Sequence, residues 1–465
     1  MIQVAFNPTV AAAIQDRTLQ RVFRDALFPR LLYRMEAQPE LWPVNLGTNA
    51  TFSRTGLITP TTRPLTAGQD PTPKTYDVEQ WEVSAEQWGD SIDTHMPTSY
   101  VTLASIYLRN MHQLGLHSGQ SINRVARDAL FNAYIGGQTA STLLIGAADL
   151  TITVANLAGF TRQMFNGRPQ LVSATNPLQV RIGAVGAAGT VSRNVTGFTP
   201  VTAGDEVGPG TITISAGVGG AGLPTRTAVV ARNATRVAPT PETSRLRNIV
   251  VGGGDRIDDI ATTDVLALAD IRAAVAQLRF DNVPPHEDGS YHCHLDPNAE
   301  NQIFGDNEFQ RLNQSIPDYI HYRRFAVGYL LGVTFYRNTE APTTATVVAA
   351  DGTFGAELAN PAGIPISRSI ITGQGVLDEK YLDESKYISE AGVLGKIGEF
   401  AVVNSGIQVM TERIRLILRA PLDRLQQLTS TSWSYSGGWP VPSDNVSASS
   451  LARYKRAITI IHAGA

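Results

Sequence analysis

The chain has 465 residues, enough for about three average domains or for one large, elaborated domain. Charged residues make up 17% of the sequence, below the usual quarter, and the formal net charge is −3, which argues against a protein that coats nucleic acid through a basic surface. No run approaches the ~20 apolar residues of a membrane helix, and we expect no secretory signal at the start. The single cysteine, Cys293, allows no internal disulfide and fits a reducing compartment.

The basic residues are strongly biased toward arginine, which accounts for 33 of the 38, while lysine accounts for five. Arginine makes planar, bidentate contacts and is enriched in protein interfaces, where lysine is depleted. Two explanations remain open, because a surface that contacts other protein chains and the codon bias of a GC-rich genome produce the same composition.

The first elements are a helix and a hairpin. Apolar residues within 14–27 fall near one face of an amphipathic helix that we expect to break at Pro29. In residues 43–95, a stretch rich in Thr, Pro and Gly separates the strand-like Ala50–Arg54 from Tyr76–Val83, which predicts a long β-hairpin with a proline-stiffened tip. A lone two-stranded hairpin is marginal in water, so we expect this one to lie on a neighbouring subunit.

A long helix and a β-rich module are predicted next. Residues 99–135 keep an i, i+3, i+4 apolar rhythm, with Gly115 and Gly119 expected to bend or interrupt the helix. Residues 140–253 contain short β-branched runs between glycine-rich turns. This pattern predicts a small all-β module inserted between two helical segments.

The second half of the chain is predicted to be mixed α/β. A helix with an apolar stripe over Leu268–Leu278 should be capped by Thr263 or Asp264, and it should end before Pro284. Residues 286–400 indicate strands and helices with many turns. The tail is expected to contain strand character at 407–418, a short helical stretch with Leu422, Leu425 and Leu428, and a last strand at 457–461.

A glycine motif resembles a cofactor loop in spelling only. Gly217, Gly219 and Gly222 match G-x-G-x-x-G after a strand-like run. A dinucleotide site needs a helix immediately afterwards, because the phosphates bind at its N-terminus. A β-rich run follows here instead, so the motif is predicted to be a flexible turn and no cofactor is expected.

The strongest candidate for metal chemistry is a histidine-rich segment. His292 and His294 alternate on a predicted strand and so point to one face. Two imidazoles at this spacing can share a zinc ion, with His286 or Asp296 completing the site. The favoured alternative is a turn at His286 that leads into a strand with two polar residues outward, since no other compact cluster closes a site. Cys293 points the other way and is predicted to be a core residue.

Two further segments are interpreted structurally. The mixed-sign run Asp378–Lys386 is predicted to be a charged, solvated loop, with a catalytic acid/base pair as the alternative. Trp433 and Trp439 flank a Ser-Tyr-Ser-Gly-Gly stretch that could bind sugars or bases. Packing of a terminal segment onto the core is the preferred reading, because buried aromatic rings dominate such contacts.

Two stretches of the chain carry patterns of a known family. The first is contained in Leu278–Pro342, with its segments Asn282–Pro285, Asp288–His292, Leu295–Pro297 and Gly328–Asn338. The second comprises Arg413–Gln427, Trp433–Gly437, Val441–Asp444 and Arg453–Ala457. Both resemble the major capsid proteins of tailed bacteriophages of the N4-like family.

The resemblance implies an α+β chain with the HK97-type capsid fold and an inserted small β-rich domain. It implies no enzyme, but a major capsid protein that self-assembles into hexamers and pentamers of an icosahedral head enclosing double-stranded DNA. The implied parts are an N-arm at 1–42, an E-loop at 43–95, a peripheral domain with its spine helix at 96–139, the insertion at 140–253, a linking helix at 254–281, an axial domain at 282–400 and the return to the peripheral domain at 401–465.

The same resemblance implies partners and contact residues. The partners would be further copies of the chain, a portal, and a scaffold or cement protein, with no membrane; the protein would belong to the virion after assembly in the bacterial cytoplasm. The candidate inter-subunit contacts are Arg17, Arg21, Arg24, Arg54, Arg63, Lys74 and Trp81. Two alternatives stay open: a phage tail or baseplate protein, and a zinc-dependent hydrolase that uses His292 and His294.

Overall fold

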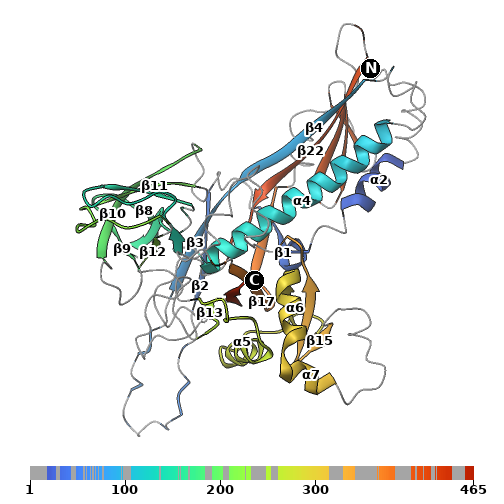
Figure 1. Ribbon diagram of the computed structural model, residues 1–465. Helices are drawn as coiled ribbons and strands as arrows, with labels where there is room; N and C mark the ends of the chain where they lie inside the picture. The colour runs from blue at the N-terminus through green and yellow to red at the C-terminus, as the bar shows by residue number, and fades with distance from the viewer. Residues whose placement is uncertain are drawn as a thin grey trace. The chain divides into compact units, whose positions relative to one another are not determined.

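The computed structural model (Figure 1) describes residues 18–27, 32–42, 49–55, 78–95, 97, 106–135, 138–155, 157, 159–165, 168–183, 191–202, 209–225, 227–231, 248–252, 260–313, 328–340, 364, 366–382, 400–403, 406–411, 413–419, 425, 427–441 and 456–464, with scattered positions between 58 and 75. The chain forms two compact units. Unit 1 combines Met1–Ala50, Val83–Asp128 and Leu377–Pro440, and unit 2 combines Thr51–Glu82, Ala129–Val376 and Val441–Ala465. None of the helices in the described ranges is long and apolar enough to span a membrane.

Unit 1 is built on a seven-stranded sheet whose strands come from distant parts of the sequence. Its order is β1-β18-β22-β21-β20-β19, and β4 pairs with the other edge of β22. The strands are β1 (Ala37–Leu41), β4 (Glu86–His95), β18 (Leu377–Tyr381), β19 (Phe400–Val403), β20 (Gly406–Thr411), β21 (Ile414–Arg419) and β22 (Leu428–Gly438). A short 3₁₀ turn, Arg34–Glu36, precedes β1.

Two helices belong to this sheet. The helix α4 (Ile106–Ile135) runs along it (Figure 1), and Trp433 on β22 donates a hydrogen bond to His117 on the helix at 3.2 Å. The helix α2 (Thr18–Leu27) buries Phe23 and Leu27 completely. Both helices were predicted, although α4 begins at residue 106.

The helix α4 is continuous from Ile106 to Ile135, so the expectation that Gly115 and Gly119 interrupt it is wrong. A Cβ atom on Gly115 would lie 2.7 Å from the backbone oxygen of Phe23 and 2.9 Å from the Cβ of Ala26. The glycine therefore permits close approach of α2 to α4, which is a packing role rather than a helix-breaking one.

Two predictions about the C-terminal half are corrected in unit 1. Leu428 begins β22, not the end of a helical stretch, while residues 420–424 lie outside the described ranges. The charged run after Val376 is not a solvated loop throughout, because Glu379 and Lys380 on β18 are buried. Trp433 and Trp439 are also buried, as the packing interpretation predicts.

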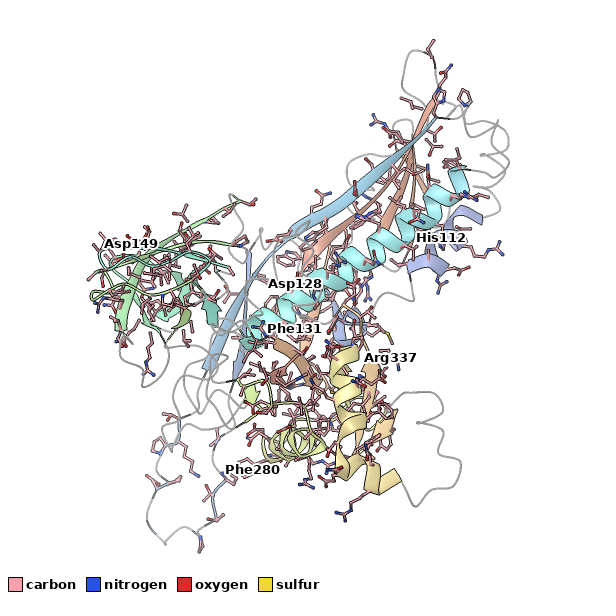
Figure 2. The ribbon with its side chains drawn as sticks, viewed as in Figure 1. His112, Asp128, Phe131, Asp149, Phe280 and Arg337 are labelled. Carbon is pink, nitrogen blue, oxygen red and sulfur yellow. The ribbon has the colours of Figure 1, made fainter. Side chains whose placement is uncertain are left out.

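Unit 2 contains a six-stranded sheet in the order β13-β23-β17-β14-β16-β15. Its strands are β13 (Asn248–Val250), β14 (Tyr291–Leu295), β15 (Tyr329–Leu330), β16 (Val333–Arg337), β17 (Ile366–Thr372) and β23 (Ala457–Ala463), and its helices are α5 (Leu268–Phe280), α6 (Pro297–Gly305) and α7 (Asn307–Asn313). Ile271 and Leu278 of α5 share an apolar core with Cys293. Arg337 (labelled in Figure 2) donates to the buried Glu300 carboxylate at 2.6 and 3.0 Å.

The cap of α5 differs from the prediction. The N-cap residue is Ala267, whose amide is bound by the Asp270 carboxylate at 3.0 Å. Asp306 accepts the next amide, that of Leu268, at 2.7 Å. Asp264 instead accepts from the Ala261 amide at 2.8 Å within the preceding turn. Ala267 is extended and has no side chain that could accept a hydrogen bond, so the first amides of the helix are satisfied by Asp270 within it and Asp306 beyond it.

The predicted β-rich module is present as a nearly closed barrel over 138–231. The predicted bounds of 140–253 extend too far, because β13 belongs to the other sheet of unit 2. Its sheet order is β5-β12-β9-β10-β11-β6, with β5 (Gln138–Ala140), β6 (Thr151–Val154), β9 (Leu178–Ile182), β10 (Val191–Pro200), β11 (Gly210–Ile214) and β12 (Ala228–Ala231). The first and last strands meet because Ser141 bridges Val154 and the Thr142 amide donates to Thr153 at 2.9 Å. A separate pair is formed by β7 (Arg162–Phe165) and β8 (Arg168–Leu171).

Two other predictions concern turns and the hairpin. Gly219 and Gly222 have φ of +78° and +79°, and Leu223 then forms a bridge with Ile145 rather than starting a helix, which confirms the turn. The hairpin is present as a two-stranded sheet of β2 (Asn49–Thr55) and β3 (Val78–Ser84). The adjoining β4, by contrast, joins the large sheet of unit 1.

Candidate functional sites

A buried charge cluster lies where β1 meets β18. The two strands pair in parallel, with Pro39 opposite Glu379. The Glu379 carboxylate is fully buried and accepts from the Arg34 guanidinium at 2.6 and 3.2 Å. Arg34 is itself 4% exposed, so the ion pair is removed from water. The guanidinium donates to both carboxylate oxygens, which is the geometry that a buried pair needs.

Two neighbouring strands also reach Glu379. The Tyr435 hydroxyl of β22 donates to the carboxylate at 3.1 Å, and the Arg413 guanidinium before β21 lies 3.3 Å from it. Arg34 also stacks over the Tyr435 ring at 5.7 Å. Burial, and next the charge of Glu379, raise the pKa of Tyr435 well above its ordinary value, so the hydroxyl remains a donor. One carboxylate therefore connects three segments of the sheet.

A second ion pair follows on the same strands. Lys380, 3% exposed on β18, binds the Glu40 carboxylate of β1. The Trp42 amide, just after β1, donates to the backbone oxygen of Tyr381 at 2.8 Å. No local signal distinguishes Glu379 and Lys380 from the other charges of their run, which is why sequence reasoning missed them.

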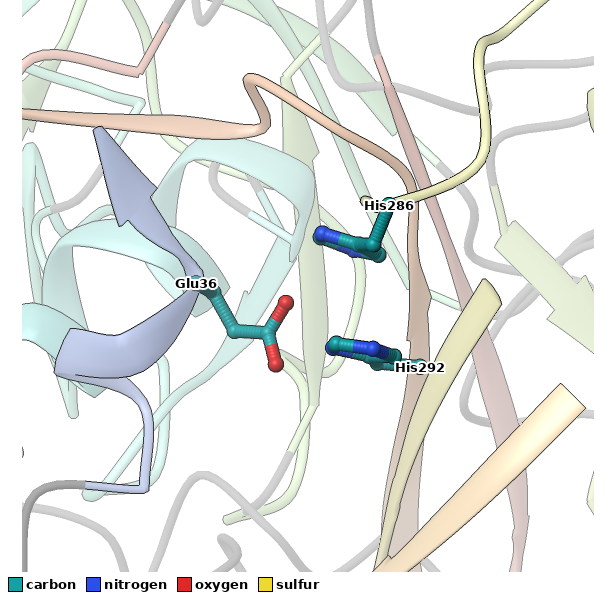
Figure 3. Close-up of side chains that lie close together, drawn as sticks. All are labelled: Glu36, His286 and His292. Atoms are coloured by element: carbon teal, nitrogen blue, oxygen red, sulfur yellow. The ribbon is translucent and has the colours of Figure 1, made fainter. Parts of the chain in front are cut away.

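The histidine-rich segment lies in unit 2. His286 and His292 stack with ring centroids 3.9 Å apart and an interplanar angle of 9° (Figure 3). Glu36, also labelled in Figure 3, belongs to unit 1 and is not part of this pair. His286 forms a hydrogen bond with the Thr372 hydroxyl at 3.2 Å, and Gly289 has φ of +77° in the turn between the two histidines. The predicted turn leading into a strand is confirmed, but the expectation that both histidines of the strand point outward is wrong, because His294 is buried.

Asp288 stabilises this turn. Its carboxylate accepts from the Ser290 hydroxyl at 2.7 Å, the Ser290 amide at 2.9 Å and the His292 ring at 3.0 Å. Burial alone would raise the pKa of Asp288, but the hydrogen bonds from Ser290 and His292 outweigh it and bring the pKa down to about 2. The arrangement is that of an ordered turn.

The zinc arrangement is not assembled. His292 and His294 do share a face, since both contact the Tyr336 ring, at 5.0 and 5.6 Å. Within the described part of the chain, however, no group of three metal-ligating side chains contains both. Asp296 caps α6, accepting from Ala299 at 3.2 Å and from the Ser367 hydroxyl at 3.1 Å. Cys293 is buried in the core as predicted, and burial raises the pKa of its thiol.

Five of the residues expected at subunit contacts lie within the described ranges, on α2 or in the hairpin. Arg21 and Arg24 are exposed on α2. Lys74 is exposed near the hairpin tip and donates to the Thr61 hydroxyl at 2.8 Å. Trp81 is on β3. Arg54 is on β2, and Arg17 and Arg63 lie outside the described residues.

No family model matches this sequence, and no curated protein matches it. Solved structures do. The capsid asymmetric unit of cyanophage Pam1 is similar with a TM-score of 0.51 and 10% identity, over 96% of this chain and 93% of that chain. The capsid of Ralstonia phage GP4 gives a TM-score of 0.46 and 12% identity over 92% and 87% of the two chains. The acidic stable capsid of Helicobacter pylori bacteriophage KHP30 gives 0.45 and 9% over 92% and 88%. The match to the Pam1 capsid, over 96% of this chain, shows that the chain shares a mixed α+β fold with a phage capsid protein.

Proposed function

We propose that this chain is the major capsid protein of a tailed bacteriophage. Copies of it assemble into hexamers and pentamers, and these close into an icosahedral head around double-stranded DNA. The observation that carries the proposal is the likeness to the Pam1 capsid, with a TM-score of 0.51 over 96% of the chain. The role is structural rather than enzymatic, and it makes the protein a component of the virion that assembles in the bacterial cytoplasm.

The composition and the hairpin support this function. The two-stranded sheet of β2 and β3 has little core of its own, and a neighbouring subunit supplies a surface for it. A net charge of −3 lets the shell enclose DNA without binding it tightly. In this proposal the N-arm and the E-loop carry the contacts, through Arg17, Arg21, Arg24, Arg54, Arg63, Lys74 and Trp81.

The finer assignments follow from the same proposal. The sequence patterns favour the N4-like family, with unit 1 corresponding to the peripheral domain and the main sheet of unit 2 to the axial domain. The barrel at 138–231 is an insertion into that fold. A portal complex and a scaffold or cement protein are the expected partners besides further copies of the chain.

Negative-stain electron microscopy of the expressed full-length protein tests the assembly. Closed icosahedral particles, or isolated hexamers and pentamers, are the expected result. Rings or tubes would point to a tail or baseplate protein instead. A monomer at every concentration, with or without co-expressed scaffold, would contradict the proposal.

A matched pair of variants tests the contact assignment. Arg21→Ala combined with Arg24→Ala removes two exposed cations from α2, and Asp25→Ala removes the exposed anion that follows Arg24. We expect the arginine variant to lower the particle yield severalfold while the aspartate variant does not. Equal yields from both would remove α2 from the proposed contacts.

A further inference from the structure

The segment Tyr33–Trp42 is held in place without an apolar face of its own. Ala37 is half-buried, and the other four residues of β1 are exposed. In the described part of the sheet β1 pairs only with β18, and Pro39 has no amide hydrogen to donate. Hydrophobic burial along the strand therefore contributes little to keeping it docked.

Its attachment comes from both ends. Tyr33 and Trp42 are buried, the Tyr33 amide donates to the Asn123 side chain of α4 at 2.7 Å, and the Trp42 amide binds the Tyr381 oxygen. Next to each anchor lies one of the two ion pairs: Arg34 with Glu379, and Glu40 with Lys380. The polar middle is thus stretched between two anchored ends.

Glu379 decides whether the first end stays attached. Its carboxylate pairs with Arg34, lies against Arg413 and accepts a hydrogen bond from the Tyr435 hydroxyl. Without its charge, the two guanidinium groups would lose the carboxylate that they share. Because a buried cation that has lost its anion is strongly unfavourable, the first end would leave its place rather than adjust slightly.

We propose that Tyr33–Trp42 is a releasable strap and that Glu379 is its latch. The strap follows α2 in the chain and precedes the β2–β3 hairpin, so its release removes from the sheet the segment that joins these two elements. This inference rests on the proposed function for its purpose: α2 and the hairpin are the elements expected to contact other subunits, and a strap with a docked and a released state sets when they can do so.

Hydrogen exchange measured by mass spectrometry on the full-length unassembled protein tests the strap. In Glu379→Gln we expect the amides of 37–42 to exchange at least 10-fold faster, while β21 and the barrel keep their rates. The matched control is Glu308→Gln, which removes the exposed Arg272–Glu308 pair at 2.8 Å and should leave 37–42 unchanged. No acceleration in Glu379→Gln would overturn the proposal, as would equal acceleration throughout the sheet.

A milder variant covers the case in which Glu379→Gln does not fold. Tyr435→Phe keeps every charge and removes one hydrogen bond to the carboxylate. We expect about 3-fold faster exchange confined to 37–42, and unchanged exchange there would count against the latch. Both exchange measurements are made on the unassembled chain. A failure to form shells would therefore refute the proposed function without affecting the test of the strap.

Discussion

The barrel of unit 2 and the sheet of unit 1 differ in where their strands come from in the sequence and in which residues they bury. All six barrel strands come from one stretch, 138–231, and the buried residues of its core cluster are apolar, such as Val180 and Ile212. The unit 1 sheet collects strands from three stretches of the chain and buries Arg34, Glu379 and Lys380 among its apolar residues.

The difference concerns what specifies each structure. In the barrel, alternation of apolar and polar residues along each strand is enough, because all the partners lie within 138–231 and well-shaped apolar side chains can replace one another. In unit 1, Arg34 and Glu379 are 345 positions apart, so their pairing closes a long loop at a cost in chain entropy. The barrel should therefore tolerate exchange of its polar surface, and the unit 1 sheet should depend on single contacts.

Removing part of the barrel core should give the largest effect. Ile212→Ala deletes a fully buried side chain on β11, and the lost burial together with the cavity should cost about 2–5 kcal/mol of barrel stability. Hydrogen exchange of β9 to β12 measures it. The control is Thr213→Ala on the outward face, expected within about 0.5 kcal/mol. Loss of protection in unit 1 as well would show that the barrel is not an independent folding unit.

Closing the space at Gly115 should give the next largest effect. Gly115→Ala places a methyl group 2.7 Å from the Phe23 oxygen, so α2 must shift at a cost of about 1–3 kcal/mol. Faster exchange of α2 amides, without change in the barrel, is the expected readout. Gly305→Ala is the control, because nothing lies within 4 Å of its Cβ position. An unaffected α2 would mean that the helix is not held at this contact.

The parts of the molecule that could be predicted from sequence are those with local signals. The barrel strands, α4 and α5 each carry a complete period-2 or period-3.6 pattern within their own residues. The strand β22 also had a signal that was overlooked: Thr429, Thr431, Trp433 and Tyr435 are buried and alternate with serines. Its serine and glycine content resembles a loop, and only the alternation indicates a strand.

The parts that could not be predicted depend on remote partners. Nothing near Glu379 shows that an arginine 345 positions earlier neutralises it, and an Asp-Glu-Lys run is normally solvated. The zinc alternative shows the same limit, since the sequence indicates that His292 and His294 share a face but not that Tyr336 and Asp288 are their neighbours. Composition identifies candidate groups, and only the fold shows which of them meet.

The third prediction concerns pH and the buried histidine of the C-terminal strand, His462 on β23. Burial lowers the pKa of His462, which outweighs the opposing charge of Asp296 and the hydrogen bond to Ala463. A lowered pKa means that the stabilising effect is complete above the unfolded value of about 6.5 and is lost as the pH falls below it. Unit 2 should therefore be less stable at pH 5.5 than at pH 7.5 in urea unfolding.

The control for that titration is His462→Gln, which cannot be protonated. We expect its unfolding midpoint to vary less between the two pH values than that of the unchanged protein. The other facing groups, Ser367, Ser369 and the backbone of β23, do not titrate in this range, so a pH dependence that persists in the variant must come from elsewhere in unit 2.

The smallest effect should come from Asp288, and it sharpens the contrast with Glu379. Both are carboxylates with several donors, but the Asp288 side chain is 45% exposed whereas Glu379 is fully buried. Since its pKa is lowered to about 2, its contribution is present above pH 3.8 and is lost as the pH falls toward 2. Solvent screening limits it, so Asp288→Asn should cost about 0.5 kcal/mol or less in urea unfolding at pH 6. If Asp288→Asn lowered the free energy of unfolding as much as Glu379→Gln in the same assay, the number of hydrogen bonds, and not burial, would determine how much a carboxylate stabilises this chain.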